Sequence, residues 1–93
     1  MDTMLTMLKT DLGIRTSTAY DARLTQLLTA AESAIRKEGA STLDASKPLD
    51  QQLIVMYAAW LWRKRDNMEG MPRMLRWTLN NRIFSEKAGA TDG

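Results

Sequence analysis

An unbroken run of ten apolar residues at positions 53–62 constrains the fold of this chain more than any other feature. The run has about half of the roughly 20 residues that a helix needs to cross a bilayer, so it suits a buried helix in a protein core. Pro48 favours a helix start just before the run, because proline fits the first turn of a helix. We therefore expect a helix over residues 48–67 at the centre of the fold, and no membrane segment.

This helix is apolar on both sides. At about 100° per residue, Leu53 and Tyr57 lie on one side. The opposite side also carries three apolar residues, Val55, Ala59 and Trp62. Such a helix needs cover all round, and the short helix expected over residues 3–12 covers only part of one flank. We therefore expect a neighbouring subunit to cover the side of Val55, Ala59 and Trp62. The alternative is that all these residues complete the core of a monomer.

Glycines separate the remaining helical segments. Gly13 and Gly39 each follow a segment with apolar residues at helical spacing, and Gly70 precedes another, which is typical of helix boundaries. We predict an all-α fold, a small bundle of about four helices over residues 3–12, 19–38, 48–67 and 72–84. Residues 1–87 are expected to form a single domain, and the small polar residues 88–93 a flexible, disordered tail.

The residue types that carry most protein chemistry are missing. The chain has no histidine and no cysteine, which removes the commonest general base, the thiolate nucleophile and the commonest zinc ligands. The carboxylates are scattered along the chain, and no glycine belongs to a phosphate-binding motif. We therefore predict no catalytic residue, no metal site and no cofactor, and we expect a protein that binds or assembles and is not an enzyme.

The last predicted helix combines an inner stripe with two aromatic residues on its other side. The inner stripe consists of Met71, Met74, Leu75, Thr78 and Leu79. Trp77 and Phe84 share the other side and are candidates for a subunit interface, because aromatic side chains mark such interfaces. Arg82 projects into the inner stripe, where it could reach a carboxylate across a subunit boundary or pair within its own chain. The full set of interface candidates is Val55, Ala59, Trp62, Trp77, Arg82 and Phe84.

Positive charge is concentrated towards the C-terminal end. The whole chain has a net charge of +2, but residues 63–87 contain seven basic and three acidic side chains. The candidates for a basic surface are Arg63, Lys64, Arg65, Arg73 and Arg76. These residues could contact phosphate or an acidic protein. Basic residues in the last turn of a helix also suit the helix macrodipole, which is the simpler explanation.

Four blocks of sequence follow one another in a distinctive order and spacing. They are Met-Leu-Thr-Met-Leu-Lys (4–9) with Leu-Gly-Ile-Arg (12–15), Tyr-Asp-Ala-Arg-Leu (20–24) with Leu-Leu-Thr-Ala-Ala-Glu-Ser-Ala-Ile (27–35), Trp-Arg-Lys-Arg-Asp (62–66) and Met-Pro-Arg-Met-Leu (71–75). In this order the chain resembles the head-tail connector proteins, also called adaptor or head-completion proteins, of long-tailed bacteriophages and prophages. The resemblance covers nearly the whole chain, from Met4 to about Ile83.

The resemblance implies a small all-α protein that assembles as a homo-oligomeric ring beneath the portal, commonly a dodecamer. The partners it implies are further copies of the chain, the portal protein on one side and a stopper or tail-completion protein on the other. DNA passes through the lumen without sequence-specific binding. The implied location is the head-tail junction of the virion, after synthesis in the bacterial host cytoplasm. The loop at 40–47 and the C-terminal tail are expected to make axial contacts that become ordered on assembly.

Two other classes of function stay open. The first is a small helical DNA-binding module, of the terminase small subunit or helix-turn-helix type, with residues 63–82 as its basic surface. It predicts polar, base-reading residues at the start of the last helix, where this chain has Met-Pro-Arg-Met-Leu, and a higher total charge. The second is a small dimeric bundle that serves as a regulatory adaptor.

Overall fold

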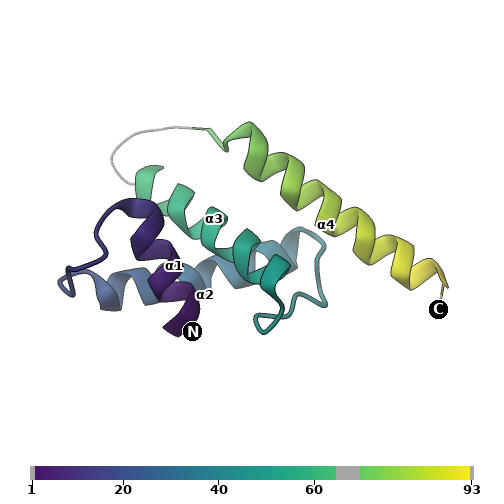
Figure 1. The fold of residues 1–93 in the computed structure, drawn as a ribbon. Coiled ribbons are helices and arrows are strands. Elements are labelled where there is room, and N and C mark those ends of the chain that lie inside the picture. Colours follow the sequence, from purple (N-terminus) through teal and green to yellow (C-terminus); the bar gives the residue numbers. More distant parts are fainter. Residues whose placement is uncertain (1, 65–69, 93) are drawn as a thin grey trace.

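Four α-helices make up the part of the chain that the computed structural model describes, residues 2–64 and 70–92 (Figure 1). They are α1 (Asp2–Leu12), α2 (Asp21–Glu38), α3 (Pro48–Lys64) and α4 (Arg73–Asp92). These two ranges contain no strand, so the predicted all-α fold of four helices is confirmed. Residues 65–67, predicted as the end of the third helix, lie outside the described residues. None of the described helices is long and apolar enough to span a membrane.

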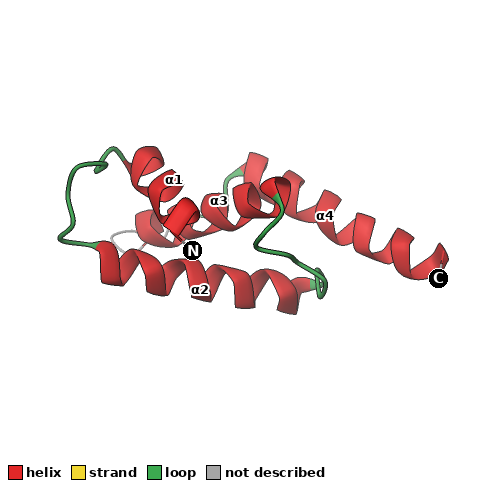
Figure 2. Ribbon diagram, turned by 60° about the horizontal axis from the view of Figure 1, so that its bottom comes forward, coloured by secondary structure: helices red, strands yellow, loops and turns green. Residues whose placement is uncertain are grey.

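The apolar helix α3 lies at the centre of the fold. The helices α1, α2 and α4 all pack against it, with α1 and α4 on either side of it (Figure 1, Figure 2). This arrangement covers α3 and leaves Leu53, Ile54 and Ala58 almost fully buried. The other helices contribute the rest of one continuous apolar cluster, including Met4, Leu8, Leu24, Leu28, Ile35, Leu75 and Leu79.

Val55 and Ala59 are buried within the chain itself, with exposures of 3% and 2%. The expectation that these two residues need a neighbouring subunit to bury them is therefore wrong, because α1 packs on this side of α3. Trp62, the third residue of the predicted face, is half-buried, and its ring packs edge-on against Tyr20 with 5.2 Å between the ring centroids. The connector that follows α1 thus extends the cover that this short helix gives to α3.

The turn after α2 requires a glycine. Gly39 has a φ of 137°, a region that side chains rarely adopt, and its backbone N donates to the carbonyl oxygen of Arg36 at 3.2 Å. A Cβ at this position would lie 3.0 Å from Cγ2 of Ile83 in α4. Gly39 therefore ends α2, as predicted, and also lets α4 approach closely.

The helix α4 is longer than the sequence predicted. It continues to Asp92, so the predicted end near residue 84 is wrong, and residues 88–92 of the predicted tail are helical. Glu86 bonds to the loop between α2 and α3, which holds the helix beyond its predicted end. The C-terminal half of α4 extends past the other helices and gives the molecule an elongated shape of 45 × 28 × 17 Å (Figure 1).

Candidate interaction surfaces

Three large apolar side chains of α4 point away from the core, and we call Met74, Trp77 and Phe84 the outer stripe. They are 63%, 62% and 73% exposed. Leu75 and Leu79, on the opposite side of the same helix, are almost completely buried. The helix α4 therefore has two apolar faces and uses one of them to hold the core.

The outer stripe confirms one sequence prediction and corrects another. Trp77 and Phe84 lie on the outer side, as predicted, whereas Met74 does not belong to the inner stripe. The buried face is centred on Leu75 and Leu79, and Met74 lies about 100° round the helix from Leu75, on the side away from Leu79. Contact between this stripe and another subunit stays a prediction. Clustered exposed aromatic side chains are typical of protein interaction surfaces.

A groove between α1 and α3, here called the α1–α3 groove, forms a second candidate surface with a volume of about 310 Å³. Its lining residues are Thr6, Met7, Thr10, Asp11, Gln52, Val55 and Met56. Its floor is apolar, since Val55 is buried and Met7 and Met56 are half-buried, and its rim is polar. Sequence reasoning missed this groove because it depends on how two helices cross, which the periodicity of either helix does not reveal.

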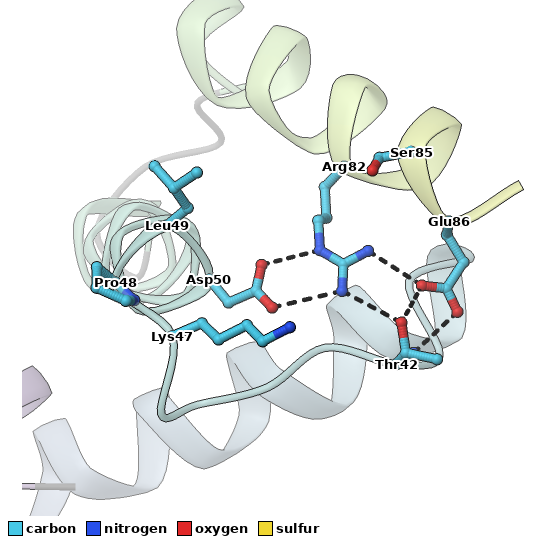
Figure 3. Close-up of a pocket in the computed structure, with 8 residues that line it drawn as sticks. All are labelled: Thr42, Lys47, Pro48, Leu49, Asp50, Arg82, Ser85 and Glu86. Atoms are coloured by element: carbon cyan, nitrogen blue, oxygen red, sulfur yellow. Dashed lines mark hydrogen bonds and ion pairs between the residues drawn. The ribbon is translucent and has the colours of Figure 1, made fainter. Parts of the chain in front are cut away.

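The guanidinium group of Arg82 is surrounded by groups of its own chain (Figure 3). Its Nε donates to Oδ1 of Asp50 at 2.8 Å, and Nη2 donates to Oδ2 of Asp50 at 3.4 Å. Nη1 donates to Oε2 of Glu86 at 3.0 Å, and Nη2 also donates to Oγ1 of Thr42 at 3.3 Å. The hydrogen bonds to Asp50 are the main cause of the raised pKa of Arg82. Pairing within the chain is thus confirmed, and a bond across a subunit boundary would have to break these contacts.

Glu86 connects α4 to the loop between α2 and α3. Its Oε1 accepts hydrogen bonds from Oγ of Ser41 at 2.6 Å and from the backbone N of Thr42 at 2.9 Å, and its Oε2 accepts one from Oγ1 of Thr42. The bonds from the Ser41 and Thr42 side chains are the main causes that lower the pKa of Glu86 from 4.5 to about 2. Glu86 therefore remains a carboxylate at neutral pH and fastens the helix to the loop.

Contacts within the chain also hold the loop at 40–47. Ala40 and Leu43 are buried, and the backbone N of Asp44 donates to Oδ2 of Asp50 at 2.9 Å. These contacts fix the loop without a partner, contrary to the expectation that it becomes ordered only on assembly. The hollow beside the loop has a volume of about 790 Å³ (Figure 3). Among its charged lining residues, Arg82 donates hydrogen bonds to both Asp50 and Glu86, so we assign this hollow a structural role.

The predicted basic residues have different surroundings. The Nζ of Lys64 lies 4.5 Å from the centroid of the Trp60 ring, and Nη1 of Arg76 lies 3.5 Å from Oε1 of Glu38. Arg63 and Arg73 are exposed, and Arg65 lies outside the described residues. Two of the five candidates are thus engaged within the chain. Arg63 and Lys64 lie in the last turn of α3, where the macrodipole favours basic residues, whereas Arg73 and Arg76 lie in the first turn of α4, where it does not.

Comparison of the chain with protein-family models, with curated proteins and with solved structures finds no match. Within residues 2–64 and 70–92, no three His, Cys, Asp or Glu side chains lie close enough together to hold a metal ion. The outer stripe and the α1–α3 groove are therefore the surfaces from which we infer a function.

Proposed function

We propose that this chain is a structural subunit of a ring that connects the head and the tail of a long-tailed bacteriophage or prophage. The four-helix, all-α fold is the one that the resemblance implies. In this role the chain has no catalytic site and needs no cofactor. Its partners are further copies of itself, the portal protein and a stopper or tail-completion protein, at the head-tail junction of the virion, and DNA passes through the lumen.

The outer stripe of α4 is the observation that carries this proposal. Three of the five large apolar residues that are exposed in the described part of the chain lie together on this one helix face. Trp77 and Phe84 are aromatic, and a fully covered aromatic side chain buries about 150–250 Å². A water-soluble monomer rarely keeps such a face in solvent, whereas a subunit of an assembly packs it against another chain.

Native mass spectrometry of the purified chain over a concentration series tests the proposal. We expect a closed species of many copies to appear as the concentration rises, because the subunits of a ring associate through a repeated contact. The same series is measured with short duplex DNA at physiological salt. A monomer or dimer that binds the duplex, with no larger species at any concentration, would favour a DNA-binding module instead.

Matched variants link the assembly to the outer stripe. The double variant Trp77→Ser/Phe84→Ser removes two aromatic side chains from the stripe, and we expect the large species to disappear. The control Leu49→Ser removes an apolar side chain that is 79% exposed but lies on α3, outside the stripe. We expect this control to assemble as the unsubstituted chain does. Equal loss of assembly in both variants would contradict a specific role of the stripe.

A further inference from the structure

We propose that the outer stripe of each subunit docks into the α1–α3 groove of the next subunit. This inference rests on the proposed ring, because a ring larger than a dimer needs two different surfaces that fit each other. The outer stripe is one such surface and the α1–α3 groove is the other. The partner is thus a second copy of this chain, and the contact runs from head to tail.

The two surfaces face opposite sides of the molecule. On α3, Asp50 holds α4 through Arg82, whereas Gln52 lines the groove. These two positions are two residues apart and so lie about 160° apart round the helix. On α4, Trp77 and the buried Leu79 have the same separation, so the outer stripe faces away from α3. The positions of α1 and α4 on either side of α3 agree with this geometry (Figure 1, Figure 2).

The spacing of the outer stripe suits a groove between two helices. Met74, Trp77, Asn81 and Phe84 recur at intervals of three, four and three residues, which places them in one row along α4. A helix that binds in a groove presents anchors at this spacing. The groove has helical walls, with residues 6–11 on one side and 52–56 on the other. A third helix can therefore pack between them through its row of anchors.

The side chains of the two surfaces are also chemically complementary. Met7 and Met56 line the apolar floor of the groove, and methionine adapts its shape well to aromatic rings. Asp11 on the rim of the groove and Arg73, four residues before Trp77, are both exposed. Neither forms an ion pair among the described residues. Their opposite charges favour docking of α4 beside α1.

The alternative is an antiparallel pair in which the outer stripes of two copies face each other, with Trp77 against Phe84 of the other copy. Such a pair brings no acidic side chain to the exposed Arg73, whereas the groove offers Asp11.

The size of the outer stripe indicates a weak single contact. A specific interface buries about 800 Å² on each partner. Two aromatic residues and one methionine that are already partly covered contribute roughly half of that area. We therefore expect single pairs to dissociate readily and a closed ring to be stable because every subunit makes two contacts.

Disulfide trapping can capture such a weak contact, and this chain has no cysteine of its own. One protein carries Asn81→Cys, between Trp77 and Phe84 of the outer stripe, and the other carries Gln52→Cys, on the rim of the groove. Both positions are exposed, so both proteins should fold. The two are mixed in equal amounts under oxidising conditions, and the cross-linked dimers are identified by mass. Cysteines join when their Cα atoms come within about 7 Å.

We expect the mixed dimer to exceed the two homodimers together by about tenfold, since only the docked arrangement brings the two sites within bonding distance. A matched control replaces Gln52→Cys by Thr29→Cys, which is exposed on α2 away from the groove, and should give no mixed dimer above background. A dominant dimer of Asn81→Cys with itself would show that two stripes pair, and it would overturn the docking.

Two outcomes separate this inference from the proposed function. If the unsubstituted chain forms a ring but the mixed dimer does not exceed the homodimers, other surfaces build the ring and the docking is wrong. If the mixed dimer forms but the unsubstituted chain never closes into a large species, the contact exists and the ring is wrong.

Discussion

The body formed by α1, α2 and α3 differs from α4 in how completely its apolar side chains are buried. In the body, even the two-sided helix α3 is covered by its neighbours, and Leu28, Ile35 and Ile54 have no exposed surface. The helix α4 joins this core through Leu75 and Leu79 and through the ion pair of Arg82 with Asp50. It leaves its second apolar face, the outer stripe, in solvent.

This difference teaches that one sequence pattern can serve two purposes. Both α3 and α4 carry apolar residues on opposite sides, and the pattern alone favours an interface at either helix. Whether such a face becomes part of the core depends on the neighbouring helices. The helix α1 covers α3, whereas no described helix lies over the outer side of α4. We therefore assign most of the folding stability to the body and the association to α4.

Truncation of a core residue in the body should have the largest effect on stability. Ile54→Ala removes three carbon atoms from a fully buried side chain, and we expect the free energy of unfolding to fall by about 3 kcal/mol. Urea denaturation followed by circular dichroism, at a concentration where the chain is monomeric, measures the change. A loss below about 1 kcal/mol would place this residue outside the core and contradict the difference in burial between the body and the outer side of α4.

Removal of the Arg82 guanidinium should have the second largest effect on the free energy of unfolding. Arg82→Met leaves Asp50, which is 5% exposed, without its cation, and we expect a loss of about 2–3 kcal/mol in the free energy of unfolding. The double variant Arg82→Met/Asp50→Asn removes the buried charge but keeps an oxygen that accepts from the backbone N of Asp44. We expect it to recover much of the loss. Additive effects of the two substitutions would show that they do not interact.

The helices themselves could be predicted from the sequence, because apolar spacing, glycines and prolines act within a few residues. The packing around them could not. The spacing of Val55 and Ala59 indicates that both side chains are covered, but it does not say whether α1 or another chain covers them. The end of α4 depends on Glu86, whose partners Ser41 and Thr42 lie more than 40 residues away in the sequence. The α1–α3 groove likewise arises from the crossing of two helices.

The attachment of α4 to the loop should depend on pH through Glu86. Its pKa of about 2 in the folded chain is lower than its ordinary value of 4.5, so the unfolded chain binds the proton more tightly. The stabilisation by this group is therefore complete above about pH 4.5 and is lost as the pH falls towards 2. We expect the difference in melting temperature between the unsubstituted chain and Glu86→Gln to shrink over this range.

Other carboxylates do not disturb this comparison. The pKa of Asp44 is also lowered, mainly by hydrogen bonds from Ser46, but Asp44 is present in both proteins and its contribution cancels. A difference in melting temperature that stays constant from neutral pH to pH 2 would show that the charge of Glu86 does not hold α4 in place.

The smallest effect on stability is expected where α4 faces solvent, and two adjacent residues test it. Met74 is 63% exposed and Leu75 is 1% exposed, so Met74→Ala and Leu75→Ala probe the two faces of one helix turn. We expect Met74→Ala to change the free energy of unfolding of the monomer by less than about 0.5 kcal/mol, and Leu75→Ala to lower it by about 2 kcal/mol. Met74→Ala should nevertheless weaken assembly, because Met74 belongs to the outer stripe, while the substituted chain stays folded. Equal destabilisation by both substitutions would place Met74 in the core and remove the distinction between the two faces of α4.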